Sequence, residues 1–395
     1  MPFSLLSTSD VVLWSILFWI CVASIGYAYI GYPALLWIVT RFQKRRAVPP
    51  STEPTLTLLI CAHNEAANIA RKLLQCLELN YPKDKLQILV ASDGSTDETE
   101  DIVRFFAPEG VELIVVPQQA GKTNAQNVAV RSARGEIIVF SDATTEYHPD
   151  ALQYIAGSLA DPNVGAVSGR YTYCDLSSSS VGEGSRAYAG YDNRIREMQS
   201  AVGSLTGCCG CIYAVRRNLY TPLEPGIISD LVEPMHVLLQ GAKVKFEPRA
   251  LAREDVGHNA GKEFSMRVRV VARALTGLAS VRQLLAPWKH PWIALQLFSH
   301  KLLRYAVPLF LAGMLVSSWM LRESMAYGVL LALQLAFYGM AALAAAIPAL
   351  QKKKLVSLPM YFCVMNAAAL WGAVKFMRGQ RYTVWKPQRE TSHAG

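Results

Sequence analysis

Three short apolar segments of this sequence each end in polar residues that suit a nucleotide. The segments and the acidic residues that follow them are Leu56–Cys61 with Glu65, Leu86–Ala91 with Asp93, and Glu136–Ser141 with Asp142. Short β-branched segments that alternate with helical ones are typical of a parallel α/β sheet. Ligands of such sheets bind at the carboxyl ends of the strands. Because all three ends carry carboxylates, the sequence predicts a site for a metal-bound diphosphate.

An alternation of strands and helices is expected to position these residues. We expect strands over 56–61, 87–91, 112–116 and 136–140, and helices over 66–79, 124–133 and 149–159, with a further helix ending near residue 106. After residue 161 the pattern is less regular. It predicts strands over 164–168, 211–215 and 243–246, a helix over 230–240, and a flexible stretch in Ser177–Ser180 and Gly182–Gly184. The fold class predicted is therefore α/β.

Asp93 is the candidate residue for the nucleoside. It begins the sequence Asp-Gly-Ser-Thr-Asp, where its carboxylate could accept a hydrogen bond from a pyrimidine N–H. Gly94 would let the backbone approach a ligand closely. The same residues also suit a turn followed by a helix cap, so both interpretations stay open.

Asp142 and Lys122 are the candidates for the diphosphate. Mg²⁺ or Mn²⁺ takes oxygen ligands and keeps waters and substrate phosphates, so one or two carboxylates suffice. Asp142 follows a buried strand and could supply one of them, or could simply cap a turn. Lys122 follows Gly121 at the start of a predicted helix, where a phosphate would also meet the helix dipole. The alternative for Lys122 is an exposed lysine.

Asp230 is the candidate general base. An apolar neighbourhood could raise the pKa of this carboxylate toward a useful value. Glu233 lies one helical turn later and is the rival, and a helix N-cap is an equal alternative for Asp230. Arg269 and Arg273 share one helix face. They could neutralise a diphosphate or contact lipid head groups.

Apolar blocks near both ends of the chain predict an integral membrane protein, which we place in the (inner) cell membrane. Residues 1–40 contain an apolar block long enough for one spanning helix, and no Lys or Arg precedes Arg41. A basic linker follows over 41–54. The positive-inside rule therefore places the catalytic domain, residues 55–280, in the cytosol. A cleaved signal peptide would need a charged start and a shorter apolar core.

Three further spans are expected within residues 305–377, namely Tyr305–Leu321, Tyr327–Leu350 and Leu355–Phe376. If all three cross, the tail over 378–395 lies outside, although its basic residues favour the inside. Residues 281–304 mix Trp, His and Lys with apolar residues and predict an interfacial helix, or a loop before a span. The net charge of +9 gathers beside the apolar blocks, which indicates lipid head groups and no nucleic acid as partner.

Taken in order, the motifs resemble those of the membrane-bound family 2 glycosyltransferases, the group that contains cellulose, hyaluronan, chitin and poly-N-acetylglucosamine synthases. The matching blocks are Ala62–Glu65, Ser92–Asp97, Gly121–Asn127, Asp142–Thr144, Ile228–Asp230 and Val270–Ala274. This resemblance implies a GT-A domain, which is a nucleotide-binding, doubly wound mixed sheet with a second half for the acceptor.

The resemblance also implies an inverting enzyme that moves a sugar from a UDP-sugar to a glycan or lipid-linked acceptor, with membrane lipids and export subunits as further partners. The residues it implies for the donor are Glu65, Asp93, Lys122, Asp142 and Arg273, with Mg²⁺ or Mn²⁺ on Asp142. Asp230 matches the family's general base.

Departures from the family pattern bear on the product. Asp142-Ala143-Thr144 lacks the second carboxylate of Asp-x-Asp, and Ile228-Ser229-Asp230 keeps only the final Asp of Thr-Glu-Asp. Of Gln-x-x-Arg-Trp only Arg273 is kept, and Ala274 stands where processive synthases have the Trp that stacks on the growing sugar. These changes argue against unaided synthesis of long polymers. Two alternatives remain: single transfer to polyprenyl phosphate or diacylglycerol, and a non-catalytic export or channel subunit.

Overall fold

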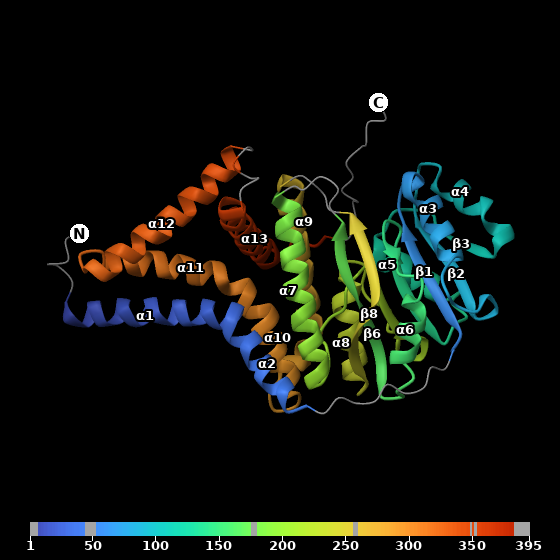
Figure 1. Ribbon diagram of the computed structural model, residues 1–395, viewed down its shortest axis with the longest axis horizontal. Helices are drawn as coiled ribbons and strands as arrows, with labels where there is room; N and C mark the ends of the chain where they lie inside the picture. Colours follow the sequence, from blue (N-terminus) through green and yellow to red (C-terminus); the bar gives the residue numbers. More distant parts are fainter. Residues whose placement is uncertain are drawn as a thin grey trace.

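An eight-stranded mixed sheet forms the core of one half of the protein, and long helices extend from one side of it (Figure 1). The computed structural model describes residues 7–43, 53–174, 180–255, 260–347, 350 and 354–382. The strands are β1 (Leu56–Ala62), β2 (Leu86–Asp93), β3 (Val111–Val116), β4 (Ile137–Asp142), β5 (Glu146–Tyr147), β6 (Val164–Cys174), β7 (Ile212–Arg216) and β8 (Lys243–Asp255). Their order in the sheet is β3-β2-β1-β4-β7-β6-β8-β5.

Helices cover the sheet and form the extension. They are α1 (Thr8–Gly26), α2 (Tyr32–Arg41), α3 (Ala66–Leu77), α4 (Thr99–Phe105), α5 (Lys122–Val130), α6 (Ala151–Ser158), α7 (Ser180–Val202), α8 (Ser229–Leu239), α9 (Ala260–Ser280), α10 (Pro291–Leu297), α11 (Leu303–Met320), α12 (Met325–Ala346) and α13 (Lys354–Met377). The π-helical segment η2 (Tyr27–Gly31) joins α1 to α2, and η7 (Phe298–Leu302) joins α10 to α11.

Strands β1 to β4 form the parallel part of the sheet that the sequence predicts. β1 lies between β2 and β4, and Cys61 pairs with Ala91 on one side and with Asp142 on the other. This register brings the carboxyl ends of the three strands to the same edge. The expected meeting of the three polar blocks at one edge of the sheet is therefore confirmed.

The parallel part is buried on both faces, as its continuous apolar segments predict. Ile60 of β1 packs in one cluster with Ile69 and Leu73 of α3. Leu59, the preceding residue, points to the opposite face and packs in a second cluster with Ala125 of α5. Ile69 and Leu73 recur at helical spacing, which explains why α3 forms and which side it buries. Replacing Leu59 by Ala would cost about 2–5 kcal/mol of stability.

The second half of the sheet differs more from the sequence prediction. β6 and β8 pair in parallel from Val164 to Cys174, which extends well beyond the strands predicted. The flexible stretch predicted for Gly182–Gly184 is wrong, because these residues lie in α7, while residues 177–179 lie outside the described residues. α7 packs against α2, β6 and β8. This tertiary packing stabilises a helix that its glycines disfavour.

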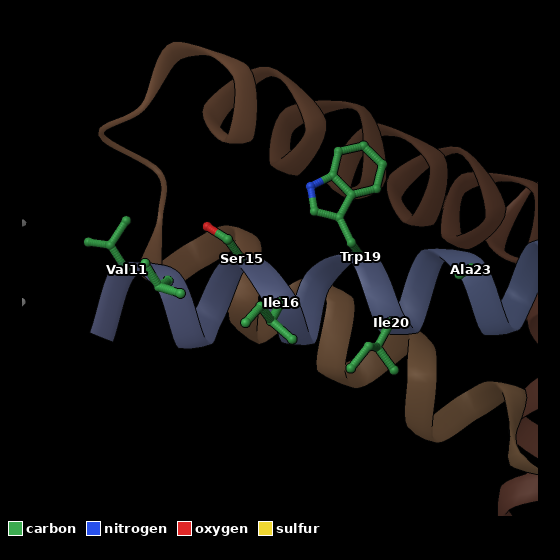
Figure 2. Close-up of a pocket in the computed structure, with 7 residues that line it drawn as sticks. Val11, Ser15, Ile16, Trp19, Ile20 and Ala23 are labelled. Carbon is green, nitrogen blue, oxygen red and sulfur yellow. The ribbon is translucent and has the colours of Figure 1, made fainter. Parts of the chain in front are cut away.

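Four helices within the described residues are long and apolar enough to cross a membrane, namely Thr8–Arg41, Pro291–Met320, Met325–Ala346 and Val356–Met377. Large apolar side chains such as Leu13 and Trp19 are more than half exposed. A shallow groove along α1 is lined by side chains of that helix alone, almost all of them apolar (Figure 2). Exposed apolar surface of this kind suits contact with lipid. These features agree with the predicted membrane protein.

The segment over 281–304 is divided and is not the single helix that the sequence predicts. A short 3-10 turn covers Arg282–Leu285, and α10 then runs through η7 into α11 as one helix of 30 residues. Pro291 stands in the first turn of α10, where its missing N–H is tolerated, so the helix begins there. Leu284 and Leu297 are buried in a cluster with residues of α8 and α9. The place of this segment at a membrane surface stays a prediction.

Candidate active site

The loops after β1 and β2 interlock through hydrogen bonds. Asn64 has a positive φ of 53°. Its side-chain oxygen accepts from the backbone N–H of Thr96 at 2.7 Å, and its own N–H donates to the hydroxyl of Ser95 at 3.1 Å. The buried Glu65 donates its backbone N–H to Thr99 Oγ1 at 2.6 Å. The two strand ends therefore form one rigid platform.

Asp93 ties this platform to the loop before α5. Its buried carboxylate accepts the backbone N–H of Ala120 at 2.9 Å and that of Gly121 at 2.8 Å. Gly94 has a φ of 62°, and a Cβ there would lie 2.4 Å from the backbone nitrogen of Gln119, so a side chain is excluded at this position. A carboxylate offers about four lone-pair sites. Two of these sites are taken by the loop, and the role of Asp93 toward the nucleoside stays a prediction.

Lys122 and Asp142 form an ion pair at the carboxyl end of β4. The ammonium group of Lys122 also donates to the carbonyl of Gly210 at 3.2 Å. Burial is the largest single effect and would lower the pKa of Lys122, but the charge and hydrogen bond of Asp142, together with other nearby groups that include Asp230, hold this pKa above its ordinary value. Lys122 is the first residue of α5, where a phosphate would also meet free backbone N–H groups. The pair therefore supplies a fixed positive charge beside an acid.

The same edge could hold a divalent cation through Asp142. The described residues contain no group of three or more His, Cys, Asp or Glu side chains around one point. Mg²⁺ or Mn²⁺ at a diphosphate keeps waters and phosphate ligands, so it needs only one or two carboxylates. Asp142 uses one oxygen for Lys122 and is about one-fifth exposed. Its other carboxylate oxygen could serve as a ligand of such an ion.

Asp230 lies in the first turn of α8, close to this ion pair. Burial raises the pKa of Asp230, and the positive charges of Lys122 and Arg196 oppose that rise. A Cβ at Gly210 would lie 2.8 Å from Asp230 Oδ2, so the glycine lets the loop before β7 pack directly on this carboxylate. Asp230 also keeps part of its surface exposed. It thus has the raised pKa and the access that a general base needs.

Glu233, the rival base, points away from solvent. It is 0% exposed, and its Oε1 accepts the backbone N–H of Thr221 at 2.9 Å. Burial raises the pKa of Glu233 to about 8. A carboxyl enclosed in this way cannot reach an acceptor hydroxyl. The geometry therefore favours Asp230 over Glu233.

Arg273 contacts the chain just before α8. Its Nε donates to the carbonyl of Gly226 at 3.2 Å, and its Nη2 donates to the carbonyl of Ile227 at 2.8 Å. Burial lowers the pKa of Arg273, and the charge of Asp230 opposes this. Arg273 therefore positions the segment that carries Asp230, and its predicted contact with the diphosphate stays a prediction.

Position 274 faces the core. Ala274 is 1% exposed and packs in a cluster with Leu231 and Leu278. In this packing the residue after Arg273 offers no surface on which an acceptor sugar could stack.

Arg196 of α7 is a site residue that the sequence analysis missed. It is mostly buried, and it donates through Nε to Asp192 at 2.7 Å and through Nη1 to the carbonyl of Gly207 at 3.4 Å. It therefore fixes the loop that packs on Asp230. Nothing in its local sequence signals this role, because α7 carries none of the recognised motifs. Lys72 of α3 was also missed, and its ammonium group donates to the carbonyl of Thr145 after β4.

Comparison with known proteins identifies the class of this domain. Residues 57–222 match the family described as glycosyl transferase family 2. A mannosyltransferase of Pyrobaculum calidifontis, solved with GDP-Man and Mn²⁺, superposes with a TM-score of 0.70 at 24% identity and covers 92% of this chain and 99% of its own. The chain therefore contains a family 2 glycosyltransferase domain with the expected GT-A fold beside helices that are long and apolar enough to cross a membrane, and the predicted glycosyltransferase class is confirmed.

Named relatives share this domain. Glycosyltransferase AglE of Haloferax volcanii is 27% identical over 209 residues, which are 51% of this chain and 62% of the relative. The poly-beta-1,6-N-acetyl-D-glucosamine synthase of Staphylococcus aureus is 27% identical over 221 residues, 54% of this chain and 53% of the synthase. The probable glycosyltransferase YdaM of Bacillus subtilis is 35% identical over 124 residues, 30% of each chain. The chain therefore spans only part of each of these relatives.

Proposed function

We propose that this protein is an inverting glycosyltransferase that moves a sugar from a UDP-sugar to a glycan or lipid-linked acceptor at the membrane. One observation carries this proposal. Asp230, a carboxylate of raised pKa, lies within electrostatic reach of the Lys122–Asp142 pair at the carboxyl ends of the strands. A base for the acceptor and a charge for the diphosphate thus meet in one place.

The reaction follows from these positions. The acceptor hydroxyl loses its proton to Asp230, and its oxygen bonds to the anomeric carbon from the face opposite the diphosphate. The bond between that carbon and the diphosphate oxygen breaks, and UDP leaves. Lys122 offsets the charge that develops on the diphosphate, an electrostatic effect that is large in a partly buried site. Inversion needs a single base, whereas a retaining glycosidase needs two flanking carboxylates.

Donor binding is assigned to the platform at the strand ends. Asp93 accepts from the base N–H while it holds the loop of Gly121, and Glu65 fixes the start of α3 beside it. Asp142 would hold Mg²⁺ or Mn²⁺, and such an ion, when bound, supplies Lewis-acid charge to the diphosphate. The choice of uracil rests on the resemblance to the synthases and is tested with the donor panel below.

The transferase domain is assigned to the cytosolic side of the cell membrane. No Lys or Arg precedes Arg41, and the basic linker follows at once. Introducing a cysteine at the exposed Glu109 gives a direct check. A membrane-impermeant maleimide should label Glu109→Cys only after the membrane is opened. Ready labelling of intact cells would overturn this topology.

Single transfer to a lipid-linked acceptor is the second candidate, and the buried Ala274 favours it. Processive synthesis needs a surface that retains the growing chain between additions, and this position does not offer one. The non-catalytic export subunit is disfavoured, because Lys122, Asp142 and Asp230 lie together with a base-like pKa shift on Asp230.

Release of UDP tests the proposed function. Purified full-length protein in nanodiscs should release UDP from one member of a panel of UDP-sugars, and faster when the natural acceptor lipid extract is added. The same panel should include GDP-sugars, since a preference for guanine would correct the donor. No release from any nucleotide sugar, by protein shown to be folded, would overturn the assignment.

A further inference from the structure

A polar cluster lies where the membrane helices meet the sheet domain. The two π-helical segments touch there, because the hydroxyls of Tyr27 in η2 and Ser299 in η7 are 3.0 Å apart. Tyr191 of α7 donates to the carbonyl of Tyr29 at 2.9 Å. These bonds join η2, α7 and η7, which are far apart in the sequence, in one place. π-Helical turns are rare and often mark functional sites.

This junction cluster contains more cations than acids. Its members are Tyr29, Tyr188, Tyr191, Asp192, Arg196, His300, Lys301 and Arg304. Asp192 is engaged by Arg196 at 2.7 Å and by His300 at 3.5 Å. Within the described residues, Lys301 and Arg304 make neither a hydrogen bond nor an ion pair with an acid, and both keep part of their surface exposed. Asp192 also attracts both cations, but it is already paired with Arg196, so the cluster keeps an excess of positive charge.

The side chain of Arg304 is held by aromatic rings. Its guanidinium carbon lies 5.6 Å from the ring centre of Tyr29, 5.4 Å from that of Tyr188 and 5.6 Å from that of Tyr191. Ring contacts of this kind hold a cation without using its N–H donors. The donors stay available for a ligand, and a guanidinium matches a phosphate through two parallel hydrogen bonds.

The position of the cluster indicates what anion it would take. Lys301 and Arg304 belong to the helix Pro291–Met320, which is long and apolar enough to cross a membrane, and charged groups in such helices are costly unless they serve a function. Lys301 also interacts electrostatically with Asp230. An anion bound by Lys301 would therefore lie on an apolar helix and near the candidate base. Lys122, whose charge we assign to the donor diphosphate, belongs to α5 and is separate from the junction cluster.

We propose that Lys301 and Arg304 bind the phosphate of a lipid-borne acceptor, so that a hydroxyl next to this phosphate reaches Asp230. The proposal rests on the glycosyltransferase function above and names its acceptor class. It assigns to the junction cluster the recognition of a phosphate that is attached to an apolar chain.

Equilibrium binding separates the phosphate from the chain that carries it. Full-length protein in phosphatidylcholine nanodiscs is titrated with radiolabelled farnesyl phosphate, with farnesol and with inorganic phosphate. Farnesyl phosphate should bind at least about tenfold more tightly than either of the other two, because each lacks one recognised part. Equal binding of farnesol would overturn phosphate recognition, and equal binding of inorganic phosphate would make this a free-phosphate site.

Variants then assign the site. Lys301→Gln and Arg304→Gln should each weaken binding of farnesyl phosphate by about tenfold or more, and Arg304→Lys should lose less. Arg322→Gln changes a basic residue that stacks on Trp319 just beyond α11, and it should bind like the wild type. Unchanged binding in both glutamine variants would overturn the proposal.

Donor binding to the same variants distinguishes this proposal from the function on which it rests. UDP-sugar binding should be unchanged in Lys301→Gln and Arg304→Gln, and a parallel loss would assign these cations to the donor instead. If no nucleotide sugar is turned over but farnesyl phosphate still binds in a charge-dependent way, the proposed function fails and the lipid-phosphate site stands.

Discussion

Two regions of the molecule, the donor edge and the junction cluster, are both built from buried polar side chains, but they are held together in different ways. The donor edge is the edge of the sheet at the carboxyl ends of β1, β2 and β4, where we propose that the donor binds. At the donor edge, side chains bond mainly to backbone in neighbouring loops, as Asn64 does with Thr96 and Asp93 with Gly121. At the junction, several bonds join side chains from segments that are far apart in the sequence. Gln199 of α7 donates to the hydroxyl of Tyr32 in α2 at 2.8 Å, across 167 positions.

If the two places bind donor and acceptor as proposed, this difference bears on how the two substrates are selected. A site built on backbone hydrogen bonds keeps its geometry when single side chains change, and it suits a donor whose nucleotide part is constant. A site built on side chains from α2, α7 and η7 depends on how the membrane helices dock. The acceptor side is therefore the part of the molecule that sequence changes can redesign most readily. The predictions below test this division.

The largest effect is expected at Asp230. Asp230→Asn keeps the shape of the side chain but cannot take a proton, and positioned bases contribute about 10²–10⁴-fold. Turnover should fall by that factor while UDP-sugar binding, measured by calorimetry, changes little. Glu233→Gln is the matched control and should turn over like the wild type. Wild-type turnover by Asp230→Asn together with lost turnover by Glu233→Gln would make Glu233 the base.

A divalent cation should be needed for transfer. Excess EDTA should reduce turnover by roughly a hundredfold, because the Lewis-acid charge on the leaving diphosphate is lost, and Mg²⁺ or Mn²⁺ should restore it. Asp142→Ala should weaken donor binding and turnover together, whereas Glu109→Ala, an exposed acid, should change neither. Full activity in EDTA would contradict the metal role, and Lys122 would then have to neutralise the diphosphate without a cation.

A smaller effect is expected at Asp93. In Asp93→Asn, one side-chain oxygen becomes an NH₂ group that cannot accept from Ala120 or Gly121, so a buried N–H loses its partner. Such a loss costs about 1–3 kcal/mol. The midpoint of thermal unfolding should fall and the KM for the donor should rise. Asp101→Asn, on the exposed face of α4, should leave the unfolding midpoint and the KM unchanged. An equal change in Asp101→Asn would show that loss of a negative charge, and not loss of the hydrogen bonds of Asp93, causes the effect.

The polar edge at the carboxyl ends of the strands could be predicted from the sequence far better than the junction cluster, for physical reasons. Asp93 and Asp142 end short strands that the local pattern predicts, and parallel strands end at the same edge of a sheet, so their approach could be predicted. The pairing of Asp192 with His300 depends on how α7 packs against η7, and no local pattern encodes that contact. α7 itself was missed, since Gly182 and Gly184 disfavour a helix until packing stabilises it.

The smallest effect on turnover is expected from Glu233, whose signature is the pH dependence of stability. Burial raises the pKa of Glu233 from 4.5 to about 8 in the folded state. The folded protein therefore binds more protons than the unfolded chain in this range, and the free energy of unfolding contributed by Glu233 falls as pH rises from about 4.5 to about 8. Glu233→Gln should remove this slope in thermal unfolding measured across that range. An unchanged slope would show that Glu233 is ionised in the folded state.

Product stereochemistry tests the central claim, inverting transfer by a single base, most directly. The enzyme is incubated with a UDP-sugar whose anomeric carbon is in the α configuration, and the new linkage is read from its proton NMR coupling constant. Attack from the face opposite the diphosphate predicts a β-linked product, and the same linkage at a much lower rate from Asp230→Asn. An α-linked product would contradict the account, because it requires a second nucleophile or attack from the face of the departing UDP.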